Sequence, residues 1–101
     1  MTAIGVFEFS AKLWLHSGGS WHFVTVPVEV SDDIRDLTDG IRHGFGSVRV
    51  AARIGRTSWR TSVFPVSSDG TYVLPVKKAV RAAENLAPGD AAVIRLELVD
   101  L

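Results

Sequence analysis

The chain has 101 residues, 47% of them hydrophobic, and its 11 basic and 11 acidic residues give a formal net charge of +0. This length predicts one domain over residues 1–101 with a buried core, and the balanced charge argues against a chain built for strong, nonspecific phosphate binding. Because cysteine is absent, disulfides and thiolate metal sites are excluded, and because neither a signal peptide nor a long apolar run is recognisable, we expect a cytoplasmic protein with no membrane partner.

The first two predicted strands form a hairpin. Apolar and polar residues alternate over residues 7–15, which is typical of a half-buried strand. A glycine pair at residues 18 and 19 suits a two-residue turn, and a second strand is expected from residue 21 to about residue 30. This register places Phe23 opposite Trp14 on an aromatic face, with an aliphatic face behind it. Both faces therefore need cover, which a barrel or a two-sheet sandwich supplies.

A short helix is expected next. Ser31 is predicted to cap its first turn, where the neighbouring aspartates suit the positive end of the helix dipole. Apolar residues then recur at helical spacing, and Gly40 and Gly44 weaken and end the helix after roughly ten residues. His43 lies near this end, where a positive charge is favourable.

Residues 44–65 are predicted to form a second hairpin, around which the rest of the chain is arranged. The first strand, residues 48–54, has small apolar residues on one face and Arg49 and Arg53 on the other. A glycine turn leads to the return strand, which carries Trp59 on one face and Arg60 on the other before Pro65 ends it.

Three more elements complete the predicted domain. A short strand is expected over residues 71–76, followed by a helix over residues 77–86 with an apolar stripe of Val80, Ala83 and Leu86. A proline-glycine turn ends this helix, and the last strand is expected over residues 91–100. Six strands and two short helices in the crossovers make a small, mainly β domain.

Several short patterns resemble domain-of-unknown-function family 1905, a family of small bacterial and archaeal domains. They are Trp21-x-Phe23, Gly46-x-Val48-x-Val50, Trp59-x-Thr61-Ser62-x-Phe64-Pro65, Tyr72-x-Leu74-Pro75-Val76-x-Lys78 and Gly89-Asp90. The resemblance covers nearly the whole chain. It implies a six-stranded double-split β-barrel, or pseudobarrel, with two short helices. It implies no activity.

The C-terminal third also resembles the half-barrel of swapped-hairpin transcription factors and antitoxins. The shared order is strand, proline, short amphipathic helix, Gly-Asp turn and strand, over residues 74–90 and the strand that follows. Those proteins dimerise and bind DNA, so a DNA-binding regulator is the alternative function, although zero net charge disfavours nucleic acid. Because this chain is about twice as long as one such half, we expect it to complete the barrel alone, as a monomer or weak dimer.

Catalytic motifs are absent from the sequence. It contains no Gly-x-Ser-x-Gly elbow, no phosphate-binding loop and no His-Glu-x-x-His helix. His16 and His22 are predicted to point to opposite faces of the first hairpin, which argues against a shared metal. We therefore expect no enzyme activity, no catalytic residues, no metal and no cofactor. An enzyme would be favoured if Asp90, His43 and Arg81 converged in one pocket.

The basic residues of the second hairpin carry the functional hypothesis. The predicted ligand-binding residues are Arg49, Arg53, Arg56, Trp59, Arg60, Ser62, Lys78 and Arg81. The planar guanidinium suits carboxylate or phosphate, and an adjacent tryptophan suits an apolar or aromatic body. We therefore predict a non-catalytic binding or interaction module for an anionic small molecule or an acidic protein surface. Two simpler interpretations stay open, in which the arginines form only a solvated strand face and the three tryptophans only pack in the core.

Overall fold

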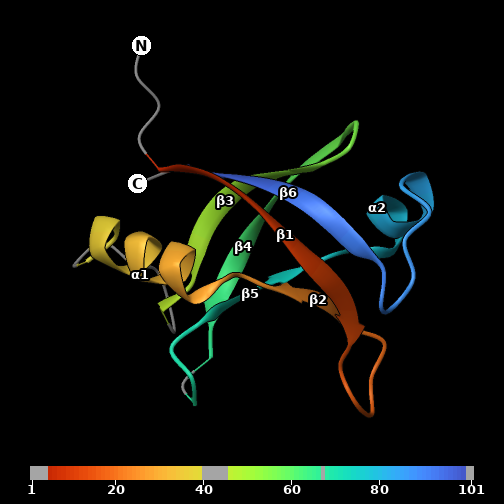
Figure 1. The fold of residues 1–101 in the computed structure, drawn as a ribbon, viewed down its shortest axis with the longest axis horizontal. Helices are drawn as coiled ribbons and strands as arrows, with labels where there is room; N and C mark the ends of the chain where they lie inside the picture. Colours follow the sequence, from red (N-terminus) through yellow and green to blue (C-terminus); the bar gives the residue numbers. More distant parts are fainter. Residues whose placement is uncertain (1–4, 40–45, 67, 100–101) are drawn as a thin grey trace.

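The computed structural model describes residues 5–39, 46–66 and 68–99 as a closed antiparallel barrel with two helices (Figure 1). The strands are β1 (Val6–Leu15), β2 (His22–Thr25), β3 (Val48–Ile54), β4 (Thr57–Pro65), β5 (Tyr72–Pro75) and β6 (Ala91–Leu98). They follow one another around the barrel in the order β1-β2-β5-β4-β3-β6. The helices α1 (Val28–Leu37) and α2 (Lys78–Ala83) lie on opposite sides of it. Neither helix is long and apolar enough to cross a membrane, a finding that covers only these segments.

Two strands, β1 and β4, divide their hydrogen bonds between two neighbours. Residues 6–12 of β1 pair with β6, and residues 13–15 pair with β2. Residues 57–63 of β4 pair with β3, whereas only Phe64 and Pro65 pair with β5. The barrel therefore consists of two small sheets joined through these two strands. This arrangement confirms the mainly β fold and the double-split barrel that the family resemblance implied.

Strand alternation fills the barrel as predicted. In β3 the four apolar residues at alternate positions are buried, whereas Arg49 and Arg53 are exposed. Three apolar residues of β6 face the same interior. In the first hairpin Trp14 lies opposite Phe23, which confirms the predicted register. A period of two therefore identifies most of the core correctly.

The second half of the predicted strand over residues 21–30 is wrong. The strand β2 ends at Thr25, and α1 begins at Val28, because Pro27 occupies the N-cap position with φ −54° and has no N–H to lose. Ser31 consequently lies inside the helix and does not cap it. The predicted helix end at Gly40 and Gly44, and the nearby His43, fall outside the described residues.

The second helix is shorter than predicted: α2 covers six residues, whereas ten were expected. Asn85 adopts a positive φ of 54°, a conformation that asparagine tolerates and that ends the helix. Ala83 is exposed, so the predicted apolar stripe reduces to buried Val80 and half-buried Leu86.

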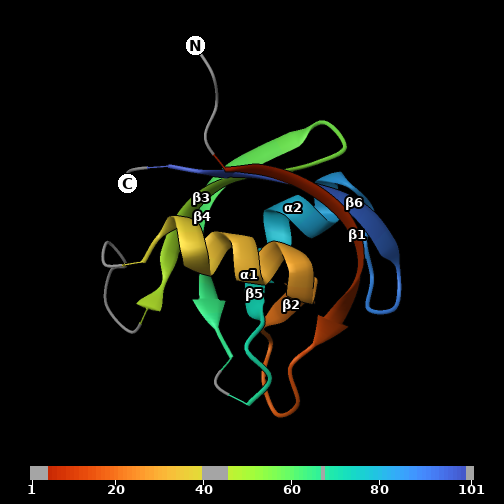
Figure 2. The same ribbon diagram turned by 60° about the vertical axis from the view of Figure 1, so that its left-hand side comes forward.

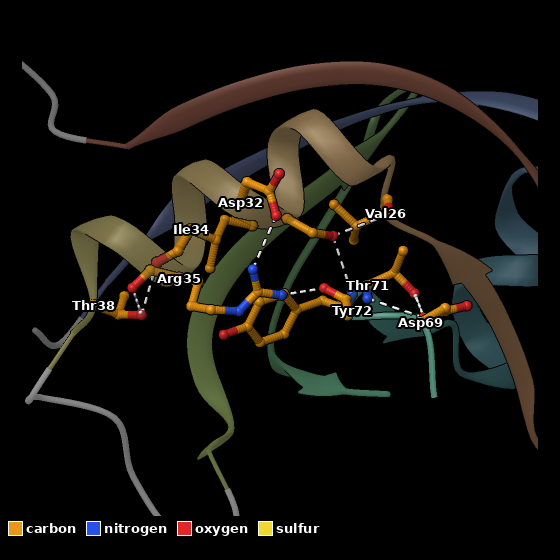
Figure 3. Close-up of polar contacts among 10 residues, drawn as sticks. Val26, Asp32, Ile34, Arg35, Thr38, Asp69, Thr71 and Tyr72 are labelled. Atoms are coloured by element: carbon orange, nitrogen blue, oxygen red, sulfur yellow. Dashed lines mark hydrogen bonds and ion pairs between the residues drawn. The ribbon is translucent and has the colours of Figure 1, made fainter. Parts of the chain in front are cut away.

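A polar junction ties α1 to the start of β5 (Figure 3). The Ser31 hydroxyl donates to the Val26 carbonyl at 3.1 Å and accepts from the Tyr72 N–H at 3.0 Å. Arg35 forms an ion pair with Asp32 at 2.9 Å, and its other terminal nitrogen donates to the carbonyl of residue 70. These contacts place the helix across one end of the barrel.

The turn before β5 supplies a pH prediction. The Thr71 hydroxyl and N–H donate to Asp69 Oδ1 at 2.6 and 3.0 Å, and these bonds hold the pKa of that carboxyl below its ordinary value of 3.8. The unfolded state therefore binds the proton of Asp69 more readily than the folded state does. The contribution of the Asp69 carboxylate to the free energy of unfolding is complete above pH 3.8, and it disappears as the pH falls through the folded-state pKa. We expect the stability difference between the wild type and Asp69→Asn, measured by urea unfolding, to shrink over this acid range. A difference independent of pH, or one unchanged in a Thr71→Val background, would contradict this cause.

Candidate functional site

A pocket of about 340 Å³ lies between the first half of β4, the end of β5 and α2. It exists because β4 pairs with β5 only through Phe64 and Pro65, so the earlier part of β4 diverges from β5. The turn after β1 closes one side through Trp21, and α2 closes another through Arg81. Figure 1 shows α2 beside the barrel.

Four cationic side chains line the pocket, and no described Asp or Glu does. Arg60 comes from β4, Lys77 and Lys78 from the start of α2, and Arg81 from the next turn of the same helix. Lys78 and Arg81 are three residues apart and therefore share one helix face. All of the lining residues that carry a formal charge are therefore positive, which favours an anion in the pocket.

A chain of hydrogen bonds orients Arg81. Its Nε donates to the Val76 carbonyl at 3.2 Å, and its Nη1 donates to His22 Nε2 at 3.4 Å. His22 Nδ1 lies 2.9 Å from the Ser20 carbonyl, which assigns the ring proton to Nδ1 and leaves Nε2 as the acceptor. Neither of these partners is an acid, so the hydrogen bonds that orient the guanidinium do not offset its positive charge.

Aromatic and apolar side chains form the remaining walls. Trp59 is buried, with 8% of its surface exposed, and so it packs against the core as well as the pocket. Trp21 is 61% exposed and Phe64 43% exposed, and both stand at the rim. The pocket therefore combines cationic and aromatic lining residues, which suits an anion with an apolar or aromatic body.

The structure brings together half of the residues predicted to bind a ligand. Trp59, Arg60, Lys78 and Arg81 line the pocket, although they come from separate elements. Their convergence depends on the strand order, which places the end of β5 and α2 beside β4.

The other four predicted residues lie elsewhere. Arg53 lines a separate hollow of about 300 Å³ with Glu8 and donates from Nε to the Gly55 carbonyl at 3.0 Å. Arg49 is exposed on β3 opposite Ser62, and Arg56 is exposed in the hairpin turn. For Arg49 and Arg53 the reason is topological, because β3 lies between β4 and β6 and is not next to β5.

Eight pocket residues were not among the predicted ligand-binding residues. They are Ser20, Trp21, His22, Thr61, Phe64, Pro75, Val76 and Lys77. Trp21 was considered as a residue that could stack on a ligand, with core packing favoured, and His22 was assigned to the first hairpin only. Nothing in their spacing relates either residue to residues 60 or 81. The usable signal was the aromatic face of that hairpin, which required cover or a ligand.

The residues considered for an enzyme do not form a described constellation. Asp90 is exposed in the turn before β6, where its Oδ2 accepts from the Ala87 N–H at 2.9 Å, and it is not a pocket residue. Arg81 lines the pocket, and His43 is outside the described residues. Within the described part of the chain, no group of three or more His, Cys, Asp or Glu side chains could hold a metal ion.

Comparison with protein families gives a match over most of the chain. Residues 9–96 match the family model described as "Domain of unknown function (DUF1905)". The matched segment begins within β1 and ends within β6, so it includes the pocket and both helices. No curated protein matches the chain.

Proposed function

The chain belongs to domain-of-unknown-function family 1905, and from that premise, which supplies no activity, we propose that it is a non-catalytic module that binds an anionic ligand in the pocket beside α2. One observation carries the proposal: four cations and no described acid line a pocket that also has aromatic walls. If the arginines formed only a solvated strand face, there would be no reason for cations from β4 and from α2 to line the same pocket.

The size and shape of the pocket favour a small ligand. A volume of about 340 Å³ lies in the lower part of the range for small-molecule sites. Arginine binds carboxylate and phosphate through paired hydrogen bonds, and Arg81 is already oriented by Val76 and His22. An acidic side chain of a protein partner would satisfy the same chemistry, and it is the second form of this proposal.

A DNA-binding regulator is the weaker alternative. The swapped-hairpin proteins that motivate it complete their barrel by dimerising, whereas one copy of this chain supplies all six strands of its barrel. Duplex DNA therefore enters the experiment as a competing outcome, recognised by affinity that falls steeply with salt.

The test compares two variants that remove the same charge. We expect the ligand-induced rise in melting temperature with phenyl phosphate or inorganic phosphate to be lost in Arg60→Gln/Lys78→Gln, with affinity at least about tenfold weaker by calorimetry. Arg49→Gln/Arg53→Gln is the matched control, because it also removes two positive charges, but from β3, and leaves the lining of the pocket unchanged. Equal losses in both variants would reduce the effect to net charge, and tighter salt-sensitive binding of duplex DNA would replace the proposal with the alternative.

A further inference from the structure

The basic pocket adjoins an aromatic surface on the outside of the barrel. A second hollow, also about 340 Å³, is lined by His16, Trp21, Phe23, Phe64 and Val73. Trp21 and Phe64 line both this hollow and the basic pocket. One ligand can therefore contact the cations and the aromatic surface at the same time.

The rings on this surface are arranged in a row. Trp21 lies parallel to Phe23, with an interplanar angle of 10° and ring centroids 6.0 Å apart. Trp14 follows at 5.2 Å from Phe23, and His16 meets Phe23 edge-on at 6.2 Å. Because Phe23 covers one side of Trp21 while the indole remains 61% exposed, a further planar ring has room to stack on it.

The backbone holds Trp21 firmly in this position. Its carbonyl accepts from the His16 N–H at 2.9 Å, which closes the first hairpin. The carbonyl of the next residue, His22, accepts from the Val76 N–H at 2.9 Å, which ties the same segment to the end of β5. These bonds fix the backbone that carries the indole, and the indole itself stacks on Phe23, so a ligand that stacks on it orders little of the protein.

Exposure of so much aromatic surface needs a physical reason. A large apolar side chain left in water forfeits stabilisation that burial would provide, and exposed apolar patches commonly mark binding sites. Here the patch borders Arg60, Lys78 and Arg81, which suit the charge density of a phosphate better than that of a single carboxylate.

Resting on the anion-binding function above, we propose that the ligand is a nucleotide unit, with its phosphate in the basic pocket and its base stacked on Trp21. Free nucleotides and single-stranded nucleic acid both carry this chemistry, since each joins a phosphate to a planar base. Stacking on an aromatic platform beside a positively charged groove is a general means of binding single strands.

The experiment measures the affinity of the full chain for AMP, ribose 5-phosphate and adenosine by calorimetry. We expect AMP to bind roughly ten- to hundredfold more tightly than ribose 5-phosphate, the range that stacking of one base supplies. Trp21→Ala should abolish this difference by weakening AMP binding much more than ribose 5-phosphate binding, because the phosphate contacts come from other residues. Trp21→Tyr should retain most of the difference, and Val93→Ala, an exposed apolar residue beside Arg53, is the control that should change nothing.

Two further arms identify the source of the ligand and the competing occupant. A single-stranded oligoadenylate of about eight nucleotides that binds more than tenfold tighter than AMP, with strong salt dependence, would assign the site to single strands, whereas equal binding would assign it to free nucleotides. Equal affinities for AMP and ribose 5-phosphate would overturn the stacking proposal and leave the anion-binding function standing. Absence of binding by any phosphate compound would overturn both, and a dimer that Trp21→Ala dissociates would show that a second copy covers this surface.

Discussion

Replacing Tyr72 with alanine is expected to lower the free energy of unfolding by about 3–5 kcal/mol, the usual cost of removing a fully buried aromatic ring. Tyr72 is 0% exposed and is the largest of the fully buried side chains of the described core. Its ring lies under the guanidinium of Arg35, whose central carbon is 5.8 Å from the ring centroid (Figure 3). Alanine would leave a cavity where β5 meets α1, and urea unfolding monitored by circular dichroism measures the loss.

The matched variant Tyr72→Phe separates the ring from its hydroxyl. The Tyr72 hydroxyl oxygen is buried and has no hydrogen-bond partner among the residues that the structure describes. Phenylalanine therefore removes an unsatisfied polar atom and keeps the ring, so stability is expected to stay unchanged or to rise. A loss of more than about 1 kcal/mol in this variant would mean that the hydroxyl has a partner in the folded protein.

The charge distribution explains how a chain of zero net charge can hold a basic pocket. Asp32, Asp33 and Asp36 lie on α1. Figure 1 shows α1 and α2 on opposite sides of the barrel, and in Figure 2 α1 lies in front of α2. The molecule measures 35 × 34 × 22 Å, whereas exposed charges at physiological salt are screened beyond about 8 Å. The acids of α1 therefore do little to weaken the binding of an anion beside α2. For this reason the net charge of the chain was a poor guide to the electrostatic potential at the pocket.

Local patterns predicted the strands well because a strand's burial depends on its own alternation. The residues of β3 and the pairing of Trp14 with Phe23 could be assigned from a period of two and from turn length. The α1 boundary could not, because Val26 and Val28 fit a strand as well as a helix start, and the deciding residue was Pro27. A proline can end a strand or begin a helix, and only its neighbours in space distinguish the two.

Only half of the residues predicted to bind a ligand line the pocket, for a related reason. Alternation shows that Arg49, Arg53 and Arg60 point outward, but it does not show which strand lies next to each of them. The order β1-β2-β5-β4-β3-β6 makes Arg60 a neighbour of α2 and leaves Arg49 and Arg53 on the far side of β4. Such neighbours are set by long-range packing, which a single sequence does not reveal.

Ser31→Ala is expected to lower the free energy of unfolding by about 1–3 kcal/mol, because it would leave buried backbone groups without their partner. The Ser31 side chain is 0% exposed and links two elements, accepting from the Tyr72 N–H and donating to the Val26 carbonyl. Alanine removes both bonds, and no water can reach the Tyr72 N–H to replace the lost acceptor without opening the junction between α1 and β5.

Thr38→Val is the matched control for Ser31→Ala, since it removes a second buried hydroxyl at the other end of α1. Thr38 Oγ1 donates at 2.7 Å to the Ile34 carbonyl, which already accepts from the Thr38 N–H at 3.1 Å. Its loss therefore leaves no backbone group unpaired, and valine keeps the shape of the side chain, so the expected change is less than about 1 kcal/mol. Urea unfolding of both variants measures the comparison. Equal losses of unfolding free energy in the two variants would mean that the hydrogen bonds of Ser31 contribute no more than the hydroxyl of Thr38. The expected larger loss for Ser31→Ala identifies Ser31 as the polar link that fixes α1 across the end of the barrel.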